Sequence, residues 1–518
     1  MKPDSTATMA PGPDAVVSGA DLEMATIVAS PPPNHSDGPI PASTTKEDIT
    51  DPFLVTFAGP LDPEDPKNWT KSKKWAVTDV LSATGFNRIM VSTIMAPALG
   101  TIATELHMNS AESVMAMSIY LLATAFGPLL LGPLSEIYGR KPVLHASNVW
   151  FLVWNVACGF APNKELLIAA RFLAGFGASS IYALAGGVLG DIWRPEERGT
   201  SLAMYLLIPI LGSAVGPIVG GFMAGRTTWR WMFWSTSIFQ AVMVAVSFVS
   251  FWETYAPVLL ERRAARLRRE TGDGRYYTTI GRRDAKKNLG RVISRAVSRP
   301  LRLLLFHPII QLLGVISAFH YGLLYIVLST FSDLWVKQYG QSVEMSGLHY
   351  IACALGEIAA AVVGGRLMDY MYHYMQRRLG RAEHTPELRV PLSYPGTIIG
   401  PLALFLYGWA AQYHLHWAVV DAGVFLALFG SQIRGMPDQA YLMDAYPEHT
   451  TSALAATQFL KSLTAFLFPL FAPAMYDAVG YGWGNSLLAF VALGFGIPAP
   501  LILWRYGKKL REKASSSY

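Results

Sequence analysis

Five ionisable side chains lie deep within long apolar stretches of the sequence: Arg88, Arg171, His320, Glu357 and Lys461. A charged residue at the centre of a membrane helix costs roughly 2.5–3.5 kcal/mol on insertion scales, so such residues usually face a partner or a water-filled cavity. The chemistry open to these five is proton binding and ion pairing. They are therefore the first candidates for functional residues.

Arg171, Glu357 and His320 are the candidates for proton binding. A carboxylate in a low-dielectric environment can take up and release a proton near neutral pH, and we expect Glu357 to do so. Arg171 would control that proton by approaching Glu357 in only one conformation. A static ion pair that fixes helix packing is the alternative. His320 has an imidazole that can titrate physiologically, but a hydrogen-bonded, structural histidine is the favoured interpretation.

A second group of residues is predicted to line a substrate cavity. Arg88 either binds an anionic group or pairs with Asp79, one helical turn or more away. Lys461 is the other charged candidate. Aromatic side chains would make the cavity suitable for flat or cationic compounds, with packing or lipid contact as the alternative. The aromatic candidates are Tyr182, Phe319 and Tyr325.

The elements that must position these residues are membrane helices. Of the 518 residues, 52% are hydrophobic and 15% are charged, with a mean hydropathy of +0.30. Soluble proteins carry roughly 25% charged residues. Runs of about 20 apolar residues, the length of a membrane helix, occur twelve times, which predicts an all-α membrane protein. They lie near 75–103, 112–134, 142–161, 165–190, 200–224, 230–252, 306–336, 345–371, 392–412, 416–443, 451–478 and 484–506.

Basic residues predict how the spans are oriented. A strongly basic linker, 253–305, separates two sets of six spans, 71–252 and 306–506. Because Lys and Arg are retained on the cytoplasmic side, we expect the linker and both chain ends to be cytosolic. Residues 1–70, rich in Pro, Ser and Thr, are predicted to be a disordered tail with no secretory signal. Residues 507–518 form the other tail.

Several classes of function are excluded by missing patterns. Cys158 and Cys353 are the only cysteines, and no metal-ligand spacing, phosphate loop or nucleophile elbow occurs. We therefore expect no metal, no cofactor, no ATP-driven step and no enzymatic activity. The net charge of +6 is placed in a few loops between spans, so it indicates topology rather than nucleic-acid binding.

Two motifs lie at and within the spans. The loop 132–141 combines Gly132, Glu136, Gly139, Arg140 and Lys141, and we expect Glu136 to pair with Arg140 or with a partner helix end, as a latch. Its alternative is an ordinary basic loop. A related pattern ends at Asp369 six spans later, which favours a duplicated six-helix unit.

The second motif places small residues on one helix face. Gly212, Gly216 and Gly220 are spaced by four, which favours close helix packing, and Pro217 permits a kink. Gly221 completes the motif. Packing alone is the simple interpretation; control of the direction of exchange is the functional one.

These motifs resemble signatures of the major facilitator superfamily, in its fungal branch of twelve-span drug:proton antiporters. The loop 132–141 resembles the signature loop, 167–177 the fourth-span motif whose arginine is linked to proton coupling, and 212–221 the fifth-span antiporter motif. Residues 65–69 and 444–446 resemble further branch sequences. Glu136 stands where the family more often has Asp, and Lys461 where the branch often has Arg.

The resemblance implies two six-helix bundles and proton-driven export of a drug, toxin, polyamine or secondary metabolite. It implies the plasma membrane of a fungus as the location. Besides the substrate, the expected partners are protons and the lipid bilayer, and we expect a monomer. A proton-coupled uptake symporter of a small organic nutrient is the alternative, and a non-transporting receptor on the same scaffold is a weaker one.

Overall fold

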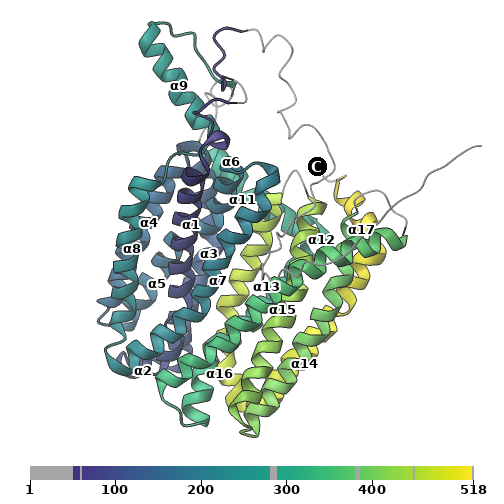
Figure 1. The fold of residues 1–518 in the computed structure, drawn as a ribbon. Helices are drawn as coiled ribbons and strands as arrows, with labels where there is room; N and C mark the ends of the chain where they lie inside the picture. The colour runs from purple at the N-terminus through teal and green to yellow at the C-terminus, as the bar shows by residue number, and fades with distance from the viewer. Residues whose placement is uncertain (1–50, 59–60, 280–288, 380–384, 447–449, 516–518) are drawn as a thin grey trace, which may run out of the picture.

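The computed structural model describes residues 51–58, 61–279, 289–379, 385–446 and 450–515. Over these residues the chain is helical, and the one β contact is an isolated bridge between Leu54 and Tyr277. Long helices run side by side between two ends of the molecule (Figure 1). We name the end that carries the chain's basic linker and C-terminus the basic end, and the other the opposite end.

The first half of the molecule contains six membrane-length passes. A short helix, α2 (Leu99–Glu105), follows the first pass at the opposite end. The fourth pass is divided at Ser179 into two helices that follow each other directly. The passes are α1 (Lys71–Thr93), α3 (Ser110–Tyr138), α4 (Arg140–Gly159), α5 with α6 (Lys164–Ala178, Ser180–Ile192), α7 (Pro195–Arg226) and α8 (Arg230–Ser250).

The second half repeats this arrangement. Its long helix α16 contains two passes, because Gly480 at φ +73° breaks the helical path. The final pass continues into α17. The helices are α12 (Pro308–Asp333), α13 (Val343–Leu379), α14 (Ser393–Gln412), α15 (Trp417–Ala445), α16 (Thr450–Gly496) and α17 (Pro498–Ser515).

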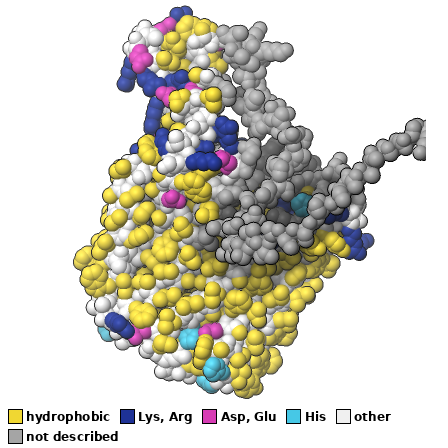
Figure 2. All heavy atoms as spheres, viewed as in Figure 1, with side chains coloured by type: hydrophobic (Ala, Val, Ile, Leu, Met, Phe, Trp, Pro, Cys, Tyr) yellow, Lys and Arg dark blue, Asp and Glu magenta, His cyan; other side chains and the backbone are white. Residues whose placement is uncertain are grey.

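The surface fits a membrane-embedded body. On the face drawn in Figure 2, a broad hydrophobic band crosses the helices, and charged side chains are gathered toward the two ends. Among the described residues, nine segments are long and apolar enough to cross a bilayer, and one of them, Ser452–Glu512, holds two passes. With α1 and α4, which are 23 and 20 residues long, they account for the twelve predicted spans.

The first pass is shorter than predicted. The sequence indicates one span over 75–103, but α1 ends at Thr93 and a 3-10 turn, Ala96–Ala98, precedes α2. Pro97 lies in that turn and cannot donate a backbone hydrogen bond, which explains the break.

The linker and the N-terminal segment fold together at the basic end. Asp62 accepts hydrogen bonds from the backbone N–H of Ala58 (2.6 Å) and from Arg263 (2.6 Å) of α9 (Ala256–Thr271). Together with the N–H of Glu64, these contacts lower the pKa of the Asp62 carboxyl to about 2. The described part of the predicted disordered tail, from residue 51 on, is therefore folded against α9; residues 1–50 lie outside the described part.

The two halves meet along two pairs of helices, α7 with α13 and α3 with α16. Thr124 of α3 and Ser462 of α16 lie within hydrogen-bonding distance, at 3.0 Å. Near them, the rings of Phe126 and Phe459 meet edge to face, with centroids 5.7 Å apart. Both contacts lie close to the middle of their helices, so the halves touch near the centre of the membrane body.

Candidate functional site

A cavity lies between the halves, near mid-height of the helices. It encloses about 740 Å³ of empty space, including the part open to solvent. At 1.5 Å per residue, Glu357 lies about 21 Å along α13 from Val343, and Lys461 lies about 16 Å along α16 from Thr450. Its lining comes mainly from the second half, with Ile210 contributed by α7. The lining residues are Ile210, Ser317, His320, Tyr321, Leu324, Glu357, Leu428, Ser431, Gln432, Arg434, Gly435 and Lys461.

Glu357 joins the two halves. It projects from α13, and its carboxylate oxygen lies 3.3 Å from the hydroxyl of Ser213 on α7. The same hydroxyl lies only 2.7 Å from the carbonyl oxygen of Ile210, one helical turn away. A hydroxyl has one proton to donate, so Ser213 can satisfy only one of these acceptors at a time.

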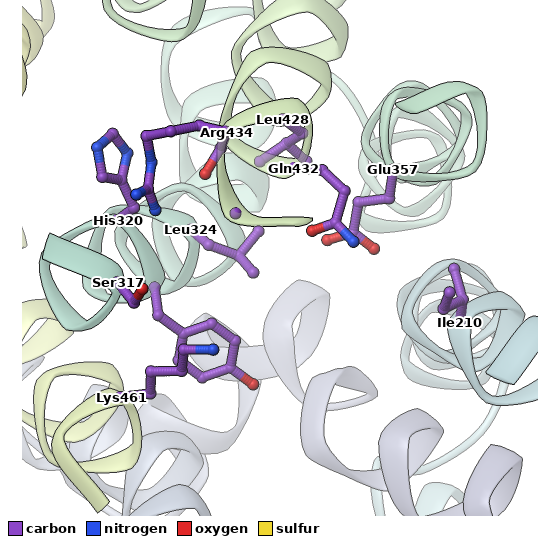
Figure 3. A pocket seen from close by; sticks show the side chains of 12 residues that line it. Ile210, Ser317, His320, Leu324, Glu357, Leu428, Gln432, Arg434 and Lys461 are labelled. Atoms are coloured by element: carbon purple, nitrogen blue, oxygen red, sulfur yellow. The ribbon is translucent and has the colours of Figure 1, made fainter. Parts of the chain in front are cut away.

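Lys461 stands across the cavity from Glu357 (Figure 3). Among the described residues, no carboxylate oxygen lies within 4.0 Å of its ammonium group. Its nearest electrostatic influences are Arg434 and Asp438 on α15. The lysine is therefore a cavity cation without a direct ion-pair partner.

Arg434 and Asp438 form a buried pair behind this wall. Arg434 donates to Asp438 at 2.5 Å, and Asp438 also accepts a hydrogen bond from Ser393 at 3.0 Å. Arg434 is 3% exposed, and its Nε has no partner among the described residues. Figure 3 shows its guanidinium beside His320 of α12. Neither member of this pair was among the predicted site residues, although opposite charges four residues apart within the predicted span 416–443 are a usable signal.

Other ionisable groups lie on the helices that line the cavity together with Glu357, whereas α7 supplies Ser213. The groups that influence it or share its cavity are Cys353 on α13, His320, Tyr321 and Tyr325 on α12, Arg434 on α15 and Lys461 on α16.

Arg171 does not approach Glu357 in this structure. It is fully buried inside the first half, where it donates to the backbone carbonyls of Val91 (3.0 Å), Ala116 (3.2 Å) and Met117 (3.3 Å). Its guanidinium also lies 4.5 Å from the ring centroid of Tyr120. These bonds tie α5 to α1 and α3.

Arg88 is likewise held within the first half. It donates to the carbonyl oxygen of Ala178 (3.2 Å), to Ser180 (2.5 Å) and to Asn148. The expected pair with Asp79 is not formed; Asp79 is exposed. Arg88 is not among the described residues that line the cavity beside Glu357.

The aromatic candidates are divided between the halves. Tyr182 of α6 is 45% exposed. Phe319 packs against Phe468 of α16, with centroids 5.6 Å apart. Tyr325 is buried against Tyr321, at 5.3 Å, and it is Tyr321 that reaches the cavity described above. Nothing in the sequence separates these two tyrosines, which lie about one turn apart on the same helix.

The latch motif forms different contacts from those expected. Gly139, at φ +100°, separates α3 from α4, and a side chain there would collide with Glu253. Among the described residues, Arg140 pairs with Asp191 at 3.4 Å and donates to Ser135 at 2.5 Å. It does not pair with Glu136, which is exposed.

Three other positions complete the latch motif. The backbone N–H of Lys141 donates to Glu253, which thereby caps the start of α4. Gly132 has open space around it. Asp369, the matching acid of the second half, lies outside the described side chains.

The glycine motif packs α7 against two helices. On one face, added Cβ atoms at Gly212, Gly216 and Gly220 would collide with the backbone of α1. On the other, a Cβ at Gly221 would lie 2.8 Å from the carbonyl oxygen of Val343 on α13. The predicted close packing is thus present within the first half and also between the halves.

Pro217 takes part in the contact between the halves. A Cβ added at Gly347 of α13 would lie 2.7 Å from the Pro217 carbonyl oxygen. Both residues lie toward the opposite end of the molecule.

The family follows from a match over most of this architecture. The family model described as Major Facilitator Superfamily matches residues 81–469, from α1 to the first pass of α16. The chain belongs to the major facilitator superfamily. It is a multi-pass membrane transporter and not an enzyme.

Fungal relatives support the expected efflux branch of the superfamily. The chain is 56% identical over 425 residues to "Probable efflux pump mfs2" of Aspergillus flavus, covering 82% of this chain and 100% of that protein. It is 38% identical to "Efflux pump vrtL" of Penicillium aethiopicum, covering 90% of this chain and 92% of that protein.

A solved structure agrees with the fold. A crystal structure of a D-xylose–proton symporter aligns with a TM-score of 0.63 at 15% identity, covering 83% of this chain and 97% of that chain. At this identity the likeness concerns the superfamily fold alone.

Proposed function

We propose that this transporter exports an organic small molecule in exchange for protons, by alternating access of the cavity to the two sides of the membrane. The substrate would be a drug, toxin, polyamine or secondary metabolite. Two of the fungal relatives carry names that describe them as efflux pumps, which supports export as the direction of transport. The rocking units would be the bundles 71–252 and 306–506, joined by the linker 253–305, with 1–70 and 507–518 as tails.

The observation that carries this proposal is the contact of Glu357 with Ser213 between the halves. Glu357 is the one carboxylate among the described residues that line the cavity. When the Ser213 hydroxyl donates its proton to Ile210, the shorter of its two contacts, its oxygen can still accept a hydrogen bond. A protonated Glu357 can donate that hydrogen bond. An ionised Glu357 would need the Ser213 proton and would break the bond to Ile210. Loss of the proton therefore weakens this contact between the halves.

The closed contacts at the opposite end define the state of this structure. Arg226 of α7 pairs with Glu344 of α13 at 3.1 Å, and Ser332 donates to the carbonyl oxygen of Pro97 at 3.4 Å. Under the basic-residue rule the basic end faces the cytosol. We therefore propose that this structure has a closed outer gate. We also propose that both chain ends are cytosolic and that the protein acts as a monomer in the plasma membrane.

The entry of protons supplies enough free energy to drive export against a concentration gradient. One proton that enters down a potential of 100 mV yields about 2.3 kcal/mol, before any pH difference. This corresponds to a roughly 40-fold concentration gradient of an exported neutral molecule.

Efflux from cells tests the proposal. A deletion strain and a complemented strain are loaded with a panel of fluorescent organic compounds, and efflux is followed with and without a protonophore. We expect complementation to accelerate efflux, the protonophore to abolish this gain, and Glu357→Gln to remove it. Glu165→Gln, at an exposed position on α5, is the matched control. Efflux that persists without a proton gradient would rule out proton coupling, and accumulation on complementation would indicate uptake.

A further inference from the structure

The charged groups of the cavity are separated onto two walls. Figure 3 shows Glu357 and Gln432 on one side of the pocket and Lys461 with His320 on the other. Glu357 projects from α13, His320 from α12 and Lys461 from α16, whereas α15 contributes Gln432 to the acidic wall and Arg434 to the basic wall. A ligand in the cavity therefore meets an anionic pole and a cationic pole at the same time.

The positive and negative charges of the two walls cancel when Glu357 is ionised. Arg434 is neutralised by Asp438, which leaves one positive charge on Lys461 and one negative charge on Glu357. A ligand with a single net charge would bring an uncompensated charge into the membrane interior, which is costly. A ligand with both charges places each against its counter-charge and leaves the total unchanged.

A second observation concerns the basic wall. The Nε of Arg434 has no partner among the described residues, although the residue is 97% buried and lines the cavity. A buried donor without a partner is unfavourable. Arg434 and Lys461 both line the cavity, so an acidic group that binds Lys461 lies on the same wall as this guanidinium.

We propose that the transported molecule is a small organic zwitterion, whose acidic group binds Lys461 and whose basic group binds Glu357. This rests on the proposed export function and names its substrate class. It also explains exchange: a proton on Glu357 removes the anionic pole, so proton and substrate compete for the same carboxylate. A polyamine, which has no acidic group, fits this cavity poorly.

Three dyes that share one xanthene skeleton test the proposal. Rhodamine 110 has a free carboxylate and basic amino groups, rhodamine 123 is its methyl ester, and fluorescein has the acid but no amino groups. Binding to the purified full-length protein in lipid nanodiscs is measured by fluorescence anisotropy, without any ion gradient. We expect rhodamine 110 to bind roughly tenfold or more tightly than either relative, as the loss of one charge-assisted contact implies.

Substitutions assign each pole. Lys461→Met should weaken rhodamine 110 roughly tenfold without weakening rhodamine 123, whereas Glu357→Gln should weaken rhodamine 110 and rhodamine 123 but not fluorescein. Lys461→Arg should retain binding, which separates lost charge from misfolding. Lys337→Met, at an exposed lysine of the opposite end, is the matched control.

The outcomes separate this proposal from the proposed function. Equal binding of the three dyes, no binding of rhodamine 110, or an unchanged dye preference in Lys461→Met overturns the zwitterion proposal and leaves proton-driven export standing. If the dyes show the expected preference but efflux is unchanged when the proton gradient is collapsed, the substrate class is supported and the proton-driven mechanism is overturned.

Discussion

Two neighbouring glycines of α7 should have different effects when replaced, because they face different helices. Gly221 faces α13 across the interface between the halves, whereas Gly220 faces α1 within the first half. In Gly221→Ala, the new Cβ would lie 2.8 Å from the carbonyl oxygen of Val343, so α7 and α13 must separate by about 0.6 Å to reach the 3.4 Å of an ordinary contact. We expect the closed outer gate to open.

The size of the effect follows from the cost of overpacking. Inserting a methyl group into a close contact costs about 1–3 kcal/mol, which is a roughly 5- to 150-fold shift of the equilibrium toward the outward-facing form. Gly220→Ala collides with the carbonyl oxygen of Ile94 in either form, so it should lower thermal stability without shifting that equilibrium. Gly494→Ala, where nothing lies within 4 Å, is the neutral control.

Distance measurements between spin labels test this contrast. Thr228→Cys and Gln338→Cys place labels at exposed positions of the two halves at the opposite end, while the native Cys158 and Cys353 are buried. We expect Gly221→Ala to enrich the long-distance population and Gly220→Ala to retain the wild-type distribution at a lower unfolding temperature. An unchanged distribution in Gly221→Ala, or an equal shift in both variants, would refute the assignment of the gate.

Three further predictions concern other contacts. Arg171→Met removes three hydrogen bonds from a buried guanidinium to backbone carbonyls of the first half. Thermal unfolding in detergent should therefore show a loss of about 2–4 kcal/mol, and unchanged stability would contradict the structural role of Arg171. Ser213→Ala removes the hydroxyl that contacts Glu357, so the same spin labels should show a roughly 2- to 10-fold shift toward the outward-facing form. An unchanged distance distribution would mean that this hydroxyl does not hold the halves together. Asp62 has a pKa of about 2, below the roughly 3.9 of the unfolded chain. The contribution of Asp62 to the docking of its segment on α9 is therefore complete above about pH 4 and is lost as the pH falls toward about 2. Limited proteolysis of the N-terminal segment should show this loss, and Asp62→Asn should show it at neutral pH.

The sequence was sufficient for the fold because its signals are local. The length of each apolar run and the positions of basic loops predict the passes, and the breaks at Pro97 and Gly480 follow from the backbone limits of the residues concerned. The glycine spacing in α7 likewise predicts a close helix contact. The spacing does not predict which helix is contacted, because Gly220 and Gly221 are adjacent in sequence and yet face the first pass and α13, respectively.

Long-range partners of the charged residues could not be predicted in this way. Arg140 pairs with Asp191, which lies 51 residues away, rather than with Glu136 in the same motif. Arg171 is satisfied by backbone carbonyls, which no sequence pattern reveals. Glu357 and His320 were predicted as proton-binding residues and Lys461 as a cavity residue, because a charge or imidazole within an apolar span is itself a signal. That Glu357 lies across the pocket from the other two depends on how the five lining helices are rotated.

The central claim is that proton movement and substrate movement are opposed and are linked through Glu357. Purified transporter in liposomes that contain a pH-sensitive dye tests it most directly, when rhodamine 110 is allowed to flow down its own gradient and the luminal pH is recorded. We expect protons to move opposite to the dye, and we expect Glu357→Gln to abolish this proton movement. Protons that move in the same direction as the dye, or dye flow with no proton movement in the wild type, would contradict it.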